Sequence, residues 1–199
     1  IDGQDIKNIS LDSLRKNMSL VSQEVVLFDD TVRNNILYAN INAGEQEIIK
    51  SNCQHVILRT SWVFSQYGSN FVKTMLKISE NNNKISVVSD QFGAPTSGKD
   101  IARTCMDIAT FLLDKNNTSS FLFHYSSYPN ISWAEFAKEI FFLAEKETTV
   151  EGISTSNYPT TALRPLNSRL DCEDIFSVLG INRPSWKKSL NKVLSELSN

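Results

Sequence analysis

The sequence lacks most of the features that mark small secreted, zinc-binding or membrane-embedded proteins. Only three cysteines occur in 199 residues, and none forms a C-x-x-C pair, so neither a disulfide framework nor a zinc site is indicated. No apolar run approaches the roughly 20 residues that a membrane span needs. The first residues also lack the basic and apolar regions of a signal peptide. We therefore expect a reduced, cytoplasmic protein without a membrane span.

An excess of charge of either sign is also missing. The 20 Lys and Arg nearly balance the 22 Asp and Glu, which leaves a net charge of -2. Because so small a charge gives no extended electrostatic field, we expect neither nucleic acid nor an anionic membrane as a partner. Histidine is scarce as well: His55 and His124 are the only two. Neither has a carboxylate or cysteine at a metal-ligand spacing, so no metal or general-base role is predicted.

Apolar residues recur with helical and strand periods along most of the chain, from about residue 43. The order of strands and helices predicts an α/β fold. The expected helices cover residues 45–49, 71–78, 101–113, 132–144, 171–179 and 185–197, and the expected strands cover 56–58, 85–88 and 121–123. In the helix 101–113 the inward residues should be Ala102, Cys105, Ile108, Ala109 and Leu112. Ser132 and Glu135 have the spacing of a capping box, and Gly180 should end the helix before it.

The first forty residues carry several short motifs in a fixed order. They are Ile1-Asp2-Gly3-Gln4-Asp5-Ile6, Leu14-Arg15, Val21-Ser22-Gln23-Glu24, Leu27-Phe28 and Asn35-Ile36. In this order and spacing they resemble the nucleotide-binding domains of ABC exporters. The resemblance implies that Gln23 belongs to the Q-loop, which in that family reaches toward the magnesium ion and the hydrolytic water.

ATP hydrolysis needs more than this glutamine. It also needs a G-x-x-x-x-G-K-[ST] loop for the phosphates, an aspartate for magnesium and a catalytic glutamate. None of the seven glycines lies in such a loop. We therefore interpret residues 1–42 as a fragment of an ABC-exporter domain. In this fragment Gln23 is vestigial, a polar loop residue without a function.

A second set of motifs begins at Ala43. It comprises residues 43–45 (A-G-E), 58–63 (L-R-T-S-W-V), 70–76 (N-F-V-K-T-M-L), 90–96 (D-Q-F-G-A-P-T), 132–133 (S-W) and 164–170 (R-P-L-N-S-R-L). These long, collinear stretches resemble dTDP-4-dehydrorhamnose reductase, an NADPH-using family of extended short-chain dehydrogenases/reductases. The resemblance covers residues 43–199. It implies an incomplete Rossmann-like fold that contains the substrate-side half of the reductase.

The matching stretches suit a cleft that holds a nucleotide sugar, because flat aromatic rings cover apolar sugar faces and short polar groups fix hydroxyls and phosphates. The resemblance implies that Trp62 lies beside the deoxysugar at the nicotinamide end, with Ser61 near it. A tryptophan that fills the core at the end of a strand is the alternative. The predicted substrate-binding residues are Ser61, Trp62, Asn70, Gln91, Pro95, Thr96, Arg164 and Asn167.

Two of these stretches also have a chemical rationale of their own. Residues 90–96 combine a turn former, a rigid proline and hydrogen-bonding side chains in one short loop, which could grip a nucleotide base or sugar. Arg164 lies in an irregular segment with prolines at residues 159 and 165. Its guanidinium could pair bidentately with a diphosphate, or it could tie two segments of the protein together.

The catalytic groups of the family are expected upstream of residue 43. Reduction of a keto sugar needs a hydride donor and an acid. The family supplies them with a G-x-x-G-x-x-G cofactor loop and a Tyr-x-x-x-Lys pair just before Ala-Gly-Glu. By this spacing the pair falls on Leu37 and Ile41, which cannot replace it, and Tyr38 is followed four residues later by Asn42. We therefore predict no catalytic residue, and no cofactor for this chain alone, although the intact family uses NADPH.

Three functional readings remain open. The chain resembles a reductase of dTDP-4-dehydro-L-rhamnose, yet as the product of a gene fusion it is expected to be inactive by itself. Alternatively, it binds a dTDP-sugar and complements a separate Rossmann half, or it is a regulatory fragment that docks on an ABC exporter or a reductase. Because the strand 56–58 would lose its neighbouring strands, self-association is also expected.

Overall fold

The computed structural model describes residues 41–51, 53–113, 119–158 and 164–198, and no side chain before Glu45. The chain divides into two compact units, residues 1–57 with 109–122 and residues 58–108 with 123–199. The predictions for Gln23, Leu37 and Tyr38 lie outside the described residues.

The first unit is built around the pairing of two short strands. It contains helix α3 (Ile41–Lys50), the first half of β1 (Val56–Arg59), the end of α5 (Gly98–Leu112) and the first half of β6 (Phe121–His124). The amide of Phe121 donates to the carbonyl of His55 over 3.0 Å, and the rings of Phe111 and Phe121 meet edge to face with centroids 5.7 Å apart. The strands predicted at 56–58 and 121–123 are therefore confirmed.

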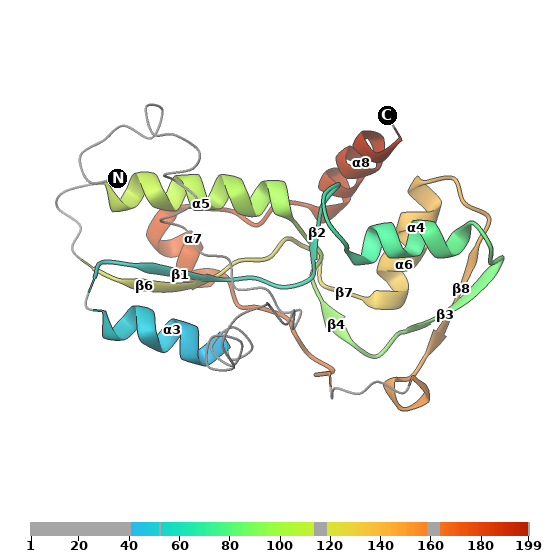
Figure 1. Ribbon diagram of the computed structural model, residues 1–199, viewed down its shortest axis with the longest axis horizontal. Coiled ribbons are helices and arrows are strands. Elements are labelled where there is room, and N and C mark those ends of the chain that lie inside the picture. The colour runs from blue at the N-terminus through green and yellow to red at the C-terminus, as the bar shows by residue number, and fades with distance from the viewer. Residues whose placement is uncertain (1–40, 52, 114–118, 159–163, 199) are drawn as a thin grey trace, which may run out of the picture. The chain divides into compact units, whose positions relative to one another are not determined.

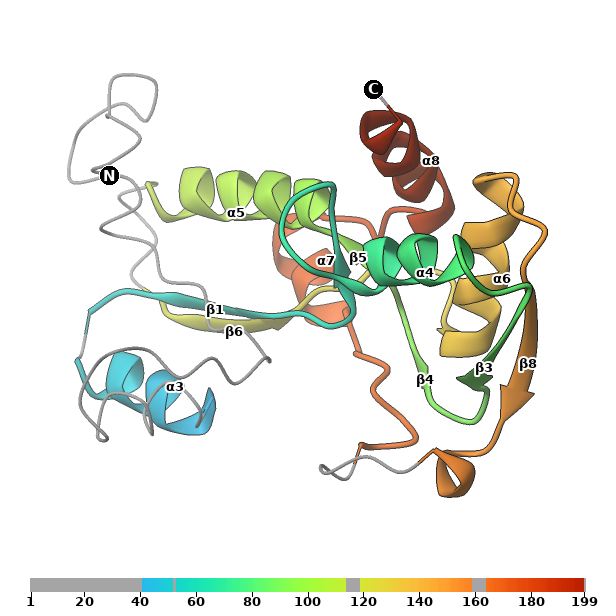
Figure 2. The ribbon, with the colours of Figure 1, turned by 45° about the vertical axis from the view of Figure 1, so that its right-hand side comes forward.

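A parallel strand pair and two helices form the centre of the second unit. Strand β3 (Lys84–Val88) pairs in parallel with β8 (Thr149–Ile153), in register from Lys84 opposite Thr149 to Val88 opposite Ile153. Helices α4 (Phe71–Ser79) and α6 (Trp133–Leu143) lie side by side near this pair in both views (Figure 1, Figure 2). Parallel strands cannot be joined by a tight turn, and the long connection from β3 to β8 ends with α6, which packs against both strands.

The apolar core of this unit lies between these helices, the strands and α8 (Trp186–Leu197). Its buried members are Phe64, Val72, Met75, Val87, Ala134, Phe136, Ala137, Ile140, Phe141, Trp186, Leu190, Val193 and Leu194. The predicted helices at 71–78 and 185–197 and the strand at 85–88 are confirmed, and the side chains of Phe136 and Phe141 are buried.

Two very short strand pairs connect distant parts of the second unit. Strand β2 (Val63–Phe64) pairs in parallel with β5 (Thr96–Ser97). Strand β4 (Phe92–Gly93) pairs in antiparallel with β7 (Ile131–Ser132). Together these pairs bring residue 62, the loop 92–96 and residue 133 into one neighbourhood, since each of them adjoins one of the four strands.

Helix ends follow the capping signals in the sequence. The hydroxyl of Ser132 accepts from the amide of Glu135 over 3.2 Å, and the Glu135 carboxylate accepts from the Ser132 amide over 2.7 Å, so the predicted capping box is present. Helix α7 (Glu173–Leu179) ends at Gly180, whose φ of 68° is left-handed. The segment predicted as irregular contains one short 3-10 turn, η2 (Thr155–Asn157).

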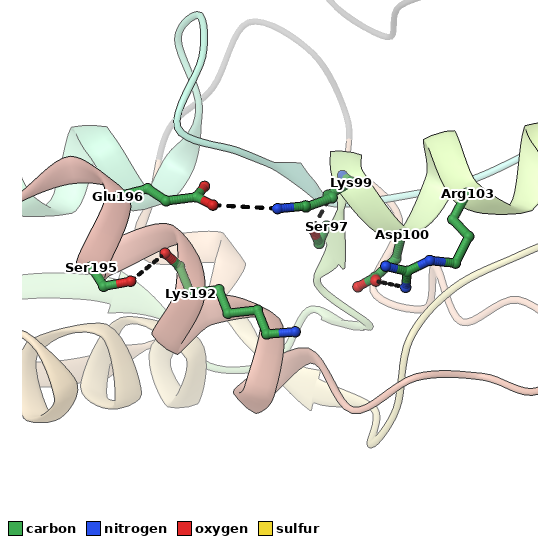
Figure 3. Close-up of polar contacts among 7 residues, drawn as sticks. All are labelled: Ser97, Lys99, Asp100, Arg103, Lys192, Ser195 and Glu196. Carbon is green, nitrogen blue, oxygen red and sulfur yellow. Dashed lines mark hydrogen bonds and ion pairs between the residues drawn. The ribbon is translucent and has the colours of Figure 1, made fainter. Parts of the chain in front are cut away.

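Helix α5 differs from the prediction in its start and in part of its inward face. It begins at Gly98 and also buries Asp100 and Thr104. Of the predicted inward residues Ile108 is buried, three are half-buried and Ala102 is exposed. The reason is a polar contact with α8: the Ser189 hydroxyl donates to the Asp100 carboxylate, and Lys99 pairs with Glu196 at 3.4 Å (Figure 3). Apolar periodicity does not detect a polar face whose groups are satisfied by a neighbouring helix.

None of the helices in the described part of the chain combines the length and the apolar character that a bilayer crossing requires.

Candidate functional site

Trp62 is the centre of the site, and its backbone is unusual. It lies between β1 and β2 with a φ of 51°, a left-handed conformation that is rare for a bulky residue. Its carbonyl accepts from the amide of Thr96 over 3.0 Å, at the start of β5. Because Thr96 and β2 hold the chain on one side, the indole is directed by a fixed backbone rather than by a free loop.

Three other residues hold the indole ring itself. The Trp133 ring stacks on it with centroids 3.6 Å apart and planes 11° apart. The Nε1–H of Trp62 donates to the hydroxyl of Ser168 over 3.1 Å. Gly93 leaves room for the ring, because a methyl group built there would come within 2.5 Å of Trp62 Cε2. The side chain of Trp62 is half-buried, so part of its surface stays open.

Trp133 and Ser168 are not among the predicted site residues, although both lie in matching stretches. Trp133 is the first residue of α6, directly after the Ser132 cap. Ser168 follows an extended segment that runs along β4, where the amide of Phe92 donates to Leu166 and the amide of Ser168 donates to Phe92, each over 2.8 Å. The sequence alone does not show that Trp133 and Ser168 contact Trp62, because this contact depends on the pairing of strands that are distant in the sequence.

The same extended segment places Asn167 and Arg169. Asn167 forms a parallel bridge with Phe92, and its Oδ1 accepts from Arg169 Nε over 2.8 Å. The Arg169 guanidinium lies 5.8 Å from the centre of the Phe92 ring, within the range of a cation–π contact. Both Arg169 and the predicted Arg164, at the start of the segment, are exposed residues, and Arg169 makes the contacts with Asn167 and Phe92.

Ser61, Pro95 and Thr96 are buried around the Trp62 backbone. The Thr96 hydroxyl donates to the carbonyl of Ala94 over 3.1 Å and accepts from the amide of Ser127 over 3.4 Å. Within the described residues the hydroxyl of Ser61 is buried without a hydrogen-bond partner, as are those of Thr60 and Ser127. Buried hydroxyls are normally paired, so these three are exceptions among the described residues.

The other two predicted amide residues, Asn70 and Gln91, are also already engaged with the protein. Asn70 caps α4, with its Oδ1 accepting from the amide of Lys73 over 3.3 Å. Gln91 Nε2 donates to the hydroxyl of Thr155 over 3.1 Å. Next to it, the carboxylate of Asp90 accepts from the hydroxyl and the amide of Thr155, and these hydrogen bonds lower the pKa of Asp90. A ligand role for Asn70 and Gln91 stays a prediction.

Two kinds of group that could hold a cofactor or a metal are absent, one from the sequence and one from the described residues. A G-x-x-G-x-x-G loop, which would seat the cofactor diphosphate at a helix N-terminus, does not occur in the 199 residues. Residues 45–51, 53–113, 119–158 and 164–198 also contain no cluster of three or more His, Cys, Asp or Glu side chains that could hold a metal ion.

Known proteins resemble this chain over most of its length. The sequence profile of the RmlD substrate binding domain matches residues 29–199. A dTDP-4-dehydrorhamnose reductase from Sinorhizobium fredii is 42% identical over 156 residues, which cover 76% of this chain and 53% of the relative. The chain therefore spans about half the length of such relatives. The profile match begins inside residues 1–42, and the comparisons do not support the ABC-exporter fragment predicted there.

Solved structures agree with this result. A dTDP-4-dehydrorhamnose reductase from Clostridium acetobutylicum superposes with a TM-score of 0.74 at 29% identity, covering 89% of this chain and 61% of that one. The enzyme from Bacillus anthracis in complex with NADP gives a TM-score of 0.66 at 33% identity, covering 78% and 52%. The fold is thus the expected mixed α/β fold of extended short-chain reductases, present in part. On the strength of the matched residues 29–199, the chain belongs to the RmlD substrate binding domain family.

Proposed function

We propose that residues 43–199 form the sugar-nucleotide-binding side of a dTDP-4-dehydrorhamnose reductase and bind a dTDP-sugar. The observation that carries this proposal is the fixed, half-buried indole of Trp62 within a stretch shared with that family. Support also comes from relatives that carry this reductase name. Those relatives are about twice as long as the matched segment, so the activity of the whole enzyme is not attributed to this chain.

The chemistry of the site suits a deoxysugar. The only polar atom of the Trp62 indole is bonded to Ser168, so the open surface of the ring is apolar. Such a surface favours the C–H face of a sugar ring or a base, which it can cover without loss of hydrogen bonds.

We propose further that these 199 residues do not reduce the sugar by themselves. The positions that correspond to the family's Tyr-x-x-x-Lys pair hold Leu37 and Ile41, and no cofactor loop occurs in the sequence. Neither hydride donor nor acid is then supplied by the chain, although both are needed for reduction of a ketone.

Calorimetric titration of the full chain with dTDP-rhamnose, and separately with NADPH, tests both parts of the proposal. We expect binding of dTDP-rhamnose that is lost in Trp62→Ala, and no binding of NADPH. Phe142→Ala is the matched control, since Phe142 is an aromatic residue that is 77% exposed. Absence of dTDP-rhamnose binding to the folded wild-type chain would disprove the proposed function. Tight binding of NADPH would disprove the second part.

A second candidate function is complementation, because the chain spans about half of its relatives. In this case a separately produced amino-terminal half of a relative supplies the cofactor loop and the Tyr-x-x-x-Lys pair. Mixing the two with NADPH and dTDP-4-dehydro-L-rhamnose should then consume NADPH, whereas each alone should not. Docking on an ABC exporter has no comparable support, because the residues that suggested it lie outside the described ranges.

A further inference from the structure

The backbone of Trp62 is held in a conformation that needs an explanation. Only two non-glycine residues of the described chain have a positive φ, Trp62 at 51° and Glu145 at 52°. Glu145 directly follows the end of α6, where a left-handed residue is common. Trp62 does not follow a helix but lies between two strands, so its positive φ has no comparable explanation. Costly conformations of this kind persist only where the surroundings enforce them, and they cluster at ligand sites.

The enforcing contacts come from three segments that are far apart in the sequence. Trp133 stacks on the Trp62 ring at 3.6 Å, and it is braced in turn by Phe71, with centroids 4.6 Å apart. Gly93 lets the ring approach β4 closely. Ser168 accepts from the Trp62 N–H and donates to the carbonyl of Phe92, each over 3.1 Å. The ring is thus fixed by stacking on its face and by a two-step hydrogen-bond relay at its N–H.

We infer that Trp133 and Ser168 are positioning residues, which act through Trp62 to hold its open ring surface ready for the apolar face of a sugar ring. This inference rests on the proposed function and adds residues that the family resemblance did not assign to the site. Because the Trp62 N–H already donates to Ser168, this contact also determines which ligands the Trp62 ring can bind. Trp62 offers no donor to a ligand, so a ring with exposed C–H groups is preferred over one that requires a hydrogen bond at this point.

The relay offers a sharp test, because threonine keeps the hydroxyl that Ser168→Ala removes. Ser168→Ala should weaken dTDP-rhamnose binding roughly 3- to 10-fold, as expected for loss of one ordering hydrogen bond. Ser168→Thr should restore binding to within about 2-fold of wild type. Ser195→Ala is the control, because the Ser195 hydroxyl is exposed and bonds only to the backbone of α8. All affinities are measured well below the unfolding temperature of each variant. Under these conditions a variant that has only lost stability is still folded, and its affinity is unchanged.

The stack is tested by Trp133→Phe and Trp133→Leu together with circular dichroism. Two indoles stacked this closely couple excitonically, and the coupled band should disappear in both variants. We expect Trp133→Phe to bind dTDP-rhamnose more weakly than wild type and Trp133→Leu more weakly still. If Trp133→Leu does not fold, the positioning role is tested by Trp133→Phe together with Ser168→Ala and Ser168→Thr.

The possible failures are distinguishable. If the wild type binds dTDP-rhamnose and folded Ser168→Ala and Trp133→Phe bind it equally well, the positioning role is wrong while the proposed function stands. If the wild type does not bind, the proposed function fails and takes this inference with it.

Discussion

Gly93 lies directly against the indole of Trp62, so that a methyl group on Gly93 would come within 2.5 Å of Trp62 Cε2 and 2.7 Å of Nε1. Real carbon atoms do not approach this closely, so the ring would have to move. The ring cannot move freely, since Trp133 stacks on it and Ser168 binds its N–H. The close approach of these two residues therefore makes the glycine a structural requirement of the site.

The first prediction concerns this glycine. Gly93→Ala should lower the free energy of unfolding by about 1–3 kcal/mol, as overpacking does, and should weaken the exciton band of the two indoles. Urea unfolding and circular dichroism measure both effects. Gly98→Ala is the control, because a methyl group there meets its nearest neighbour at an ordinary 3.5 Å. An equal, small effect of both substitutions would show that the Trp62 ring is free to shift.

The second prediction uses two phenylalanines of the same helix. Phe136 is fully buried and its ring packs near those of Phe64 and Trp186, so Phe136→Ala should cost about 3–5 kcal/mol. Phe142 is 77% exposed, and Phe142→Ala should stay within about 0.5 kcal/mol of wild type. Denaturant unfolding of both variants gives the comparison. Similar losses in the two would contradict the assignment of the core face of α6.

The third prediction concerns the capping box of α6. Ser132→Ala removes the acceptor for the amide of Glu135 and should destabilise the chain by about 1 kcal/mol. Glu135→Gln should have a smaller effect, because glutamine can still accept from the Ser132 amide. Thermal unfolding followed by far-ultraviolet circular dichroism would measure both. A harmless Ser132→Ala would mean that the N-terminus of α6 is satisfied by other groups.

The fourth prediction follows from the pKa of Asp90. The hydroxyl and amide of Thr155 bond to its carboxylate and lower this pKa from the ordinary 3.8. A lowered folded-state pKa means that the stabilisation is complete above the unfolded-state value and is lost as the pH falls through the folded-state value. Wild type should therefore be more stable than Asp90→Asn at about pH 7, and the difference should shrink below about pH 4.

Urea midpoints of both proteins at several pH values measure this difference. Asp107→Asn serves as the control, since Asp107 is an exposed residue on α5. A gap between wild type and Asp90→Asn that stays constant down to about pH 3 would contradict the assigned cause.

Much of the fold could be predicted because most of its larger elements carry a local signal, although the five-residue strand β8 was not predicted. The helices around Phe71, Phe136 and Leu190 show apolar periodicity, and the capping box and Gly180 mark helix ends. The strands β2, β4, β5 and β7 were not predicted, since each has only two residues and a period cannot be read from two positions. They form because distant segments meet, which is a property of the tertiary structure.

The candidate site was predictable only in part for the same reason. Trp62 stands out as an aromatic residue at the end of a strand, but its partners Trp133 and Ser168 lie 71 and 106 positions away (133 − 62 and 168 − 62). The contact between Asn167 and the Arg169 guanidinium could not be predicted, because only the structure shows it. Substrate contacts of Ser61, Trp62, Asn70, Gln91, Pro95, Thr96, Arg164 and Asn167 stay predictions, and the comparisons do not support an ABC-exporter origin of residues 1–42.

The pairing of β3 with β8 has a consequence for folding of the protein during its synthesis on the ribosome. Lys84 and its partner Thr149 are 65 positions apart (149 − 84), and translation proceeds at about 5–20 residues per second. Roughly 3 to 13 s therefore pass in which β3 has been made but β8 has not. During this interval the apolar Val87 and Val88 belong to an unpaired strand edge. Such an edge can associate with other nascent chains or bind chaperones. The yield of folded protein should accordingly depend on how quickly translation passes through residues 89–148, which separate the two strands.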